Sequence, residues 1–249
     1  SASFGPAVSQ DGRYVAYSSL ATNLILGDTN YVSDVFVTDR ATRQTVRASV
    51  STSGVQANSD SDEACISADG KVAGFRSWAS NLVSADTNAT SDIYVHDVTV
   101  GATSRVSGAV IGVEGDGPSA LPVLSSTGRY VAFQSRAGNL VANDSNGWDD
   151  VFVRDRQTGV TTRVSIGPSA VQSDYWAGHP AMSQDAAWIA FESYATNLVT
   201  TDTNGVGDVF VRGAYPTGIT VGDIHSALRI DAGLRSATTT DLSRLNIVT

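Results

Sequence analysis

The sequence predicts an all-β fold made of four repeated units, and three observations carry that prediction. First, the loop pattern Asp-x-Asn-x-x-x-Asp recurs every 58 residues, beginning at Asp28, Asp86, Asp144 and Asp202. Second, a short apolar run such as 35–37 follows each loop. Third, the same turn signal recurs at 9–12, 67–70, 125–128 and 183–186. Four-stranded units that repeat in register indicate a β-propeller of four 58-residue blades.

The strands of each blade follow in a fixed order. A short run precedes the turn, and Asp-Gly between apolar runs is a hairpin signal. The run after the turn is rich in β-branched and aromatic residues, at 13–18, 71–77, 129–135 and 187–193. The run after the acidic loop supplies a third strand, and a fourth lies at 44–49, 103–107 and 161–165. A parallel β-helix fits less well because its rungs are shorter.

The repeats also set the predicted domain boundaries. The propeller occupies 1–212, with repeats at about 6–63, 64–121, 122–179 and 180–212. The fourth repeat ends early, and residues 217–220 echo 158–161 and would supply its missing strand. In the tail, 213–249, Ile224 and Leu228 have helical spacing and Gly233 suits a helix C-cap, so a short helical tail is predicted.

Composition limits the classes of partner. The net charge of −9 comes from 25 acidic and 16 basic residues, and the paired aspartates of the four loops account for most of the imbalance. No basic stripe exists for a nucleic acid, and no apolar run approaches the roughly 18 residues of a membrane helix. Cys65 is the single cysteine, so no disulfide is expected within the chain.

The acidic loops predict calcium sites, about one per repeat and four in total. Carboxylate and amide oxygens are hard ligands that suit Ca²⁺. Aspartate and asparagine also favour turns, but glycine follows the asparagine in only two copies, whereas the second aspartate is constant. The predicted ligands are Asp28, Asn30, Asp34, Asp86, Asn88, Asp92, Asp144, Asn146, Asp150, Asp202, Asn204 and Asp208.

Residues that break the repeat are the candidates for a special site. Four of the residues that break the repeat are aromatic: Trp78, Trp148, Tyr175 and Trp176. Aromatic side chains are suited to contact with a partner protein or a glycan. No Gly-x-Ser-x-Gly elbow or phosphate-binding loop occurs, and the three histidines lack metal-ligand spacing. A site of Glu114, Asp116 and His179 is a weaker alternative. The sequence therefore predicts no enzyme.

The repeated motifs resemble a known family. Ser-x-Asp-Gly-Arg-Tyr-Val-Ala-Tyr at 9–17, Asp-Val-Phe-Val at 34–37 and Thr-x-Arg-Val-Ser at 103–107 resemble the TolB-like (WD40-like) propeller repeat of secreted bacterial proteins. The resemblance covers roughly residues 6–212. It implies a propeller at the cell exterior, either extracellular, at the cell surface or periplasmic. The family includes scaffolds, receptors and accessory domains of enzymes, so the resemblance alone does not choose a function.

The tail carries a second resemblance. Residues 219–223 and 227–230 are similar to half of a dockerin-type module, in which Asp223 would match the last ligand of the calcium loop. The earlier acidic ligands are absent from 212–216. The tail therefore either covers the end of its own propeller or docks to another chain, with a cohesin as the partner that the resemblance implies.

These observations favour a non-catalytic, extracellular, calcium-binding propeller that acts as a structural or protein-interaction module. The short fourth repeat also leaves room for self-association into oligomers. The alternative is a carbohydrate-binding or carbohydrate-active propeller that uses Tyr175 and Trp176. A dockerin-bearing accessory subunit is a third hypothesis.

Overall fold

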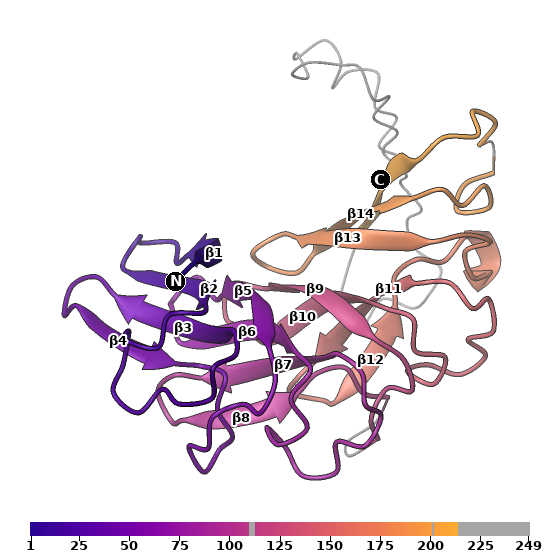
Figure 1. The fold of residues 1–249 in the computed structure, drawn as a ribbon. Helices are drawn as coiled ribbons and strands as arrows, with labels where there is room; N and C mark the ends of the chain where they lie inside the picture. The colour runs from indigo at the N-terminus through magenta and orange to yellow at the C-terminus, as the bar shows by residue number, and fades with distance from the viewer. Residues whose placement is uncertain (110–112, 201, 214–249) are drawn as a thin grey trace.

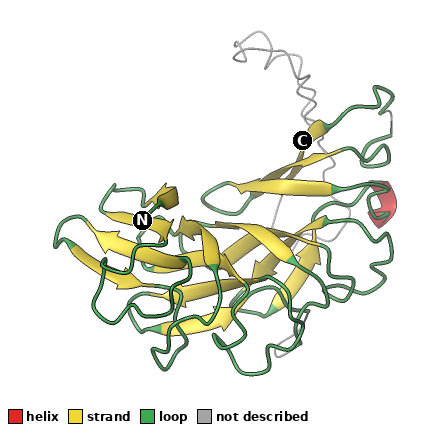
Figure 2. Ribbon diagram, viewed as in Figure 1, coloured by secondary structure: helices red, strands yellow, loops and turns green. Residues whose placement is uncertain are grey.

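The structure is a computed structural model that describes residues 1–109, 113–200 and 202–213 (Figure 1). The described chain is almost entirely β-strand and loop, with one short 3-10 helix, η1 (Pro168–Ala170) (Figure 2). Within these ranges no helix is long and apolar enough to span a membrane. The all-β class predicted by the repeats is therefore confirmed.

The strands form four antiparallel sheets, each built from one repeat. The first sheet contains β1 (Ser3–Val8), β2 (Tyr14–Ser19), β3 (Asp34–Asp39) and β4 (Gln44–Arg47). The second contains β5 (Ser61–Ile66), β6 (Val72–Ser77), β7 (Asp92–Asp97) and β8 (Ala102–Arg105). The third contains β9 (Ser119–Leu124), β10 (Tyr130–Ser135), β11 (Asp150–Asp155) and β12 (Val160–Arg163). The fourth contains β13 (Ala177–Met182), β14 (Trp188–Ser193) and β15 (Asp208–Gly213).

Each of the first three sheets has the predicted four strands in chain order, and the described part of the fourth has three. The strand predicted at 217–220, the helical tail and the dockerin-like segment lie outside the described residues. Within the described ranges, the sheets follow one another as consecutive blades around an arc (Figure 1). The architecture is that of successive blades of a β-propeller.

Hydrogen bonds from the side chains of the turn explain why it forms. In the first blade the Ser9 hydroxyl donates to Asp11 Oδ1 at 2.6 Å and accepts from the Tyr14 amide at 2.9 Å. Asp11 Oδ1 also accepts from the Arg13 amide at 2.9 Å, and Gly12 has a φ of 71°, which favours glycine. The same bonds recur around Ser67 in the second blade.

The innermost strand of each blade contains a β-bulge at the same position. The register shifts between the first two strands of every sheet. The residues in the left-handed region at this point are Gly5, Glu63, Leu121 and His179. The bulge therefore belongs to the repeat, although only the first copy uses glycine.

The core lies between the sheets. Three clusters of buried apolar residues each span two successive blades. Along β6, Val72 packs toward the third blade and Phe75 toward the first. Each sheet thus has a forward face, which meets the next blade, and a backward face, which meets the previous one. On the backward faces the central rings stack in pairs about 6 Å apart, such as Phe75 with Tyr94 at 5.9 Å.

Backbone hydrogen bonds also join the turns of neighbouring blades. The Gln10 amide donates to the Ala68 carbonyl, the Ala68 amide to the Ser126 carbonyl, and the Ser126 amide to the Gln184 carbonyl, at 3.0, 2.9 and 2.7 Å. Among the described residues, no backbone hydrogen bond joins the fourth turn back to the first. The described arc therefore begins and ends with a blade that has one neighbour.

Candidate functional site

The acidic loops bring their predicted residues together in every repeat. Each loop lies between the second and third strands of its sheet, and the second aspartate is the first residue of the third strand. In the first loop the Asn30 amide donates to Asp34 Oδ2 at 2.9 Å. The equivalent bonds are 3.0 Å in each of the other three loops, from Asn88 to Asp92, Asn146 to Asp150 and Asn204 to Asp208. Asp34 is fully buried.

An arginine lies between the two aspartates in the first three repeats. Arg47 Nη2 is 3.0 Å from Asp28 Oδ1, and Arg47 Nε is 3.5 Å from Asp34 Oδ2. Arg163 Nη1 is 3.0 Å from Asp144 and 3.2 Å from Asp150. The guanidinium thus supplies a buried positive charge at the point where the sequence predicted a metal ion.

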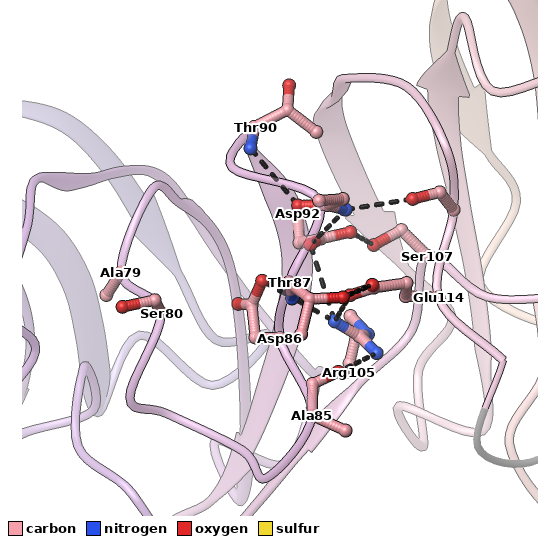
Figure 3. A network of polar contacts seen from close by, with 12 residues as sticks. Ala79, Ser80, Ala85, Asp86, Thr87, Thr90, Asp92, Arg105, Ser107 and Glu114 are labelled. Carbon is pink, nitrogen blue, oxygen red and sulfur yellow. Dashed lines mark hydrogen bonds and ion pairs between the residues drawn. The ribbon is translucent and has the colours of Figure 1, made fainter.

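The second repeat has the same arrangement with an added carboxylate (Figure 3). Arg105 Nη1 is 3.6 Å from Asp92, 3.8 Å from Asp86 and 2.9 Å from Glu114. Glu114 also accepts from the backbone amide of Thr87 at 2.9 Å, so it connects the acidic loop to the connector before the third blade. Here three carboxylates share one guanidinium.

A serine completes the polar shell of the buried aspartate. The Ser49 hydroxyl donates to Asp34 Oδ1 at 2.5 Å and accepts from the Val35 amide at 3.1 Å. Ser107 and Ser165 make the same contacts in the next two repeats. Amide, hydroxyl and guanidinium donors therefore all converge on the second aspartate, which is why this carboxylate is tolerated inside the protein.

The same loops join each blade to the next. Besides Asp34, the Asn30 amide donates to the Ala57 carbonyl at 3.0 Å. Asn88 reaches the Gly115 carbonyl at 2.9 Å, and Asn146 reaches the Ser173 carbonyl at 3.0 Å. These carbonyls belong to connectors that lead into the following blade. The loop is therefore a structural link between blades as well as a cluster of charge.

Burial shifts the titration of these aspartates. Desolvation raises the pKa of Asp92 to about 6, although Ser107, Asn88 and Arg105 oppose the shift. Burial likewise raises the pKa of Asp34 and of Asp144. Asp155, the partly buried last residue of β11, behaves in the opposite way, since the Arg129 guanidinium lowers its pKa to about 2.

The fit of the loops to a divalent ion differs between repeats. In the first three, an ion between the aspartates would have to displace the guanidinium. The asparagine oxygens of the second, third and fourth loops accept hydrogen bonds from the backbone amides of Thr90, Trp148 and Val206. Within the described ranges, no group of three or more histidine, cysteine, aspartate or glutamate side chains forms a metal site.

The repeat-breaking aromatic residues form a second candidate site. Trp148 and Tyr175 have ring centroids 4.3 Å apart, and Tyr194 lies 6.2 Å from Tyr175 and 6.3 Å from Trp176. We name these four residues the aromatic cluster. Trp148, Tyr175 and Tyr194 are exposed. The cluster lies where the third acidic loop meets the start of the fourth blade.

The fourth predicted contact residue, Trp78, is not in this cluster. Its ring stacks under the Arg76 guanidinium at 4.4 Å in the second blade. Tyr194 was missed by the sequence analysis, although it occupies the repeat position of Trp78 and breaks the pattern in the same way. Position within the repeat, rather than residue type alone, was the signal that would have found it.

The alternative site of Glu114, Asp116 and His179 is divided among separate partners. Glu114 pairs with Arg105 at 2.9 Å. The Asp116 carboxylate accepts from the Gly138 amide at 2.7 Å, and His179 Nδ1 lies 3.0 Å from Glu192. Each side chain therefore contributes to a local contact and not to a shared centre.

Replacing the central arginine should destabilise a blade strongly. We expect Arg105→Leu to lower the free energy of unfolding by about 3–5 kcal/mol, because buried carboxylates would lose their counter-charge. Arg13→Leu is the matched control, since Arg13 pairs with Asp39 at the exposed surface and its loss should cost about 1 kcal/mol or less. Urea unfolding measures both, and equal losses would contradict the buried role of Arg105.

The titration of Asp92 should also be measurable. In the presence of chelator, NMR of side-chain carboxyl carbons should show Asp92 titrating near pH 6 and Asp155 near pH 2. Because the folded state holds the Asp92 proton that the unfolded chain releases near pH 4, this group's contribution to stability falls as pH rises from about 4 to about 6. A midpoint for Asp92 below pH 4 would refute the inferred desolvation.

Comparison with known proteins gives similarity of structure alone. No protein-family model and no curated protein matches the sequence. Among solved structures, the chain is similar to TolB from Acinetobacter baumannii, with 19% identity over 84% of this chain and 40% of that chain and a TM-score of 0.49. It is also similar to the β-propeller domain of the Trilobed protease from Pyrococcus furiosus, with 12% identity over 84% of this chain and 53% of that chain and a TM-score of 0.48.

A third similar structure is an enzyme, oligogalacturonate lyase from Vibrio parahaemolyticus. Its identity is 15% over 76% of this chain and 44% of that chain, with a TM-score of 0.45. The chain therefore spans about half or less of the length of these proteins.

Proposed function

We propose that this chain is a non-catalytic β-propeller module that acts by binding a protein partner, with the aromatic cluster as its contact surface. One observation carries the proposal. Trp148, Tyr175, Trp176 and Tyr194 all break the repeat, come from three different segments of the chain, and still gather at one junction.

The exposure of these rings supports a binding role. Tryptophan and tyrosine dominate the binding energy of protein interfaces, because they bury large rigid surfaces and keep a polar group for hydrogen bonding. The packing inside a blade does not require them, since Trp148 is replaced by Val32 and Thr90 at the same repeat position. Their concentration at one junction is therefore best explained by an external contact.

The second candidate function is carbohydrate binding. The Trp148 and Tyr175 rings lie 4.3 Å apart and are inclined by only 33°, so together they offer an aromatic surface to a sugar ring. The other ring pairs are inclined by 65° and 53°, which makes the cluster uneven rather than a flat platform. The uneven surface favours a protein side chain as the occupant over an extended glycan.

The proposed location is the cell exterior, extracellular, at the cell surface or periplasmic. This proposal rests on the resemblance of the repeats to those of secreted bacterial proteins. The proposed calcium binding also continues to rest on the recurrence of the acidic loops.

Replacing two residues of the aromatic cluster should weaken binding strongly. We expect Trp148→Ala with Tyr175→Ala to weaken binding of peptides selected from a random displayed library by tenfold or more, as hot-spot residues do. Trp78→Ala is the control, because Trp78 is exposed in another blade. Glycan-array binding that depends on the same two residues would favour the carbohydrate function. Peptide and glycan binding that survives their removal would contradict both.

Calcium should stabilise the protein through the acidic loops. We expect calcium to raise the melting temperature and chelator to lower it, because an ion that binds only the folded state stabilises that state. Asp202→Asn should reduce this response, because it removes one of the predicted ligands. A melting temperature that does not change between calcium and excess chelator would refute calcium binding.

A further inference from the structure

The three junctions between blades are built in the same way, from the forward face of one blade and the backward face of the next. The forward face of the fourth blade and the backward face of the first blade have no such neighbour among the described residues. On the forward faces, Val72 and Tyr130 are each 6% exposed because the next blade covers them, whereas Trp188, at the same position in the fourth blade, is 43% exposed. The remaining forward-face residues of the fourth blade, Ala190, Val209 and Val211, are also less buried than their equivalents.

The backward face of the first blade is open in the same way. Val8 occupies the repeat position of Ile66 and Leu124, which pack against the preceding blade. Val8 is 61% exposed. Tyr17 is half-buried, whereas Phe75, its equivalent in the second blade, is completely buried. The first blade therefore presents the surface that a preceding blade would cover.

The polar groups at the two ends are complementary. At each internal junction a turn amide donates to the carbonyl of the next blade's turn. Among the described hydrogen bonds, the Gln184 amide has no acceptor and the Gln10 carbonyl has no donor. A second series runs the other way, in which the Ser61 amide donates to the Ser33 carbonyl at 2.7 Å. The Ser3 amide of the first blade is at the repeat position of the Ser61 amide. The Gly207 carbonyl of the fourth blade is at the repeat position of the Ser33 carbonyl.

The shapes of the two ends also match. The Tyr14 ring occupies the space beside Gly70, where an added Cβ would lie 2.0 Å from a ring carbon. Val72 lies beside Gly128 in the same way, at 2.7 Å. Gly12 is the equivalent glycine of the first blade, and there an added Cβ would meet only one atom, of the Arg40 side chain, at 3.8 Å. The space beside Gly12 is therefore open, and Trp188 is the side chain whose repeat position would fill it.

We infer that the occupant of these two faces is a second copy of this chain. The forward face of the fourth blade of one copy packs on the backward face of the first blade of the other, with the Trp188 ring beside Gly12. This contact repeats the internal junction between blades. It joins two different surfaces, so the copies form a closed ring only if the rotation that relates them closes. Two copies make an eight-bladed ring, within the range of 4–8 blades that propellers typically have, whereas three copies exceed it.

This association goes beyond the proposed function, because it uses the ends of the arc and not the aromatic cluster. Loss of partner binding in the Trp148 and Tyr175 variants would leave the mass of the assembly unchanged. The two proposals therefore fail independently.

Analytical ultracentrifugation of the full 249-residue chain tests the inference. We expect the unmodified chain to sediment as a dimer over a concentration series. Val8→Glu blocks one end and Trp188→Glu the other, and each alone should weaken association by about thirtyfold or more. Leu26→Glu is the control, because Leu26 is fully exposed in a loop outside both faces, and it should remain dimeric.

Mixing the two blocked variants distinguishes the geometry. Each retains the end that the other lacks, so the mixture should form a one-to-one complex through a single junction. If Val8→Glu unfolds, Gly12→Asn replaces it, since asparagine tolerates the left-handed backbone and would fill the space that the Trp188 ring is expected to occupy. A chain that stays monomeric at every concentration would overturn the inference. So would a Val8→Glu variant that still forms the dimer.

Discussion

The structure depends on placing a carboxylate inside each blade and neutralising it there. The second aspartate of every loop is the first residue of the third strand, where water is excluded. In the first three repeats the asparagine, the serine and the arginine of the same unit converge on it, so the cost of desolvation is offset by several donors at once. Because Arg47 comes from β4 and Asp34 from β3, this contact fixes the outer strand against its neighbour. The asparagine then extends the same network into the connector before the next blade.

Two surfaces of different origin remain on this scaffold. The aromatic cluster consists of residues that depart from the repeat, and it therefore adds something that the other blades lack. The open ends of the arc consist of residues that obey the repeat but have no neighbour to cover them. A protein with both surfaces would present a binding site from a larger closed framework, with each copy contributing one aromatic cluster.

The sequence predicted the strands, their order and the meeting of the acidic residues, because each has a local or periodic signature that recurs four times. It did not assign the arginine its role. Arg47, Arg105 and Arg163 recur at the same spacing within the predicted fourth strands. The sequence analysis nevertheless assigns the charge that balances the aspartates to a bound ion. Which side chains meet across a blade depends on strand pairing, which composition does not reveal. The bulge was missed for a related reason, since Glu63 has a left-handed backbone without the glycine that marks such positions.

The glycine contacts between blades bear on how such a chain avoids folding incorrectly. Four segments with nearly the same pattern compete for the same neighbours while the protein folds, and repeat proteins are prone to misassembly for this reason. Here the junctions are not interchangeable: a tyrosine ring fits beside Gly70, whereas the smaller Val72 fits beside Gly128. A blade that docked out of turn would meet a side chain of the wrong size. Small differences among the copies thereby favour packing of each blade against its correct neighbour.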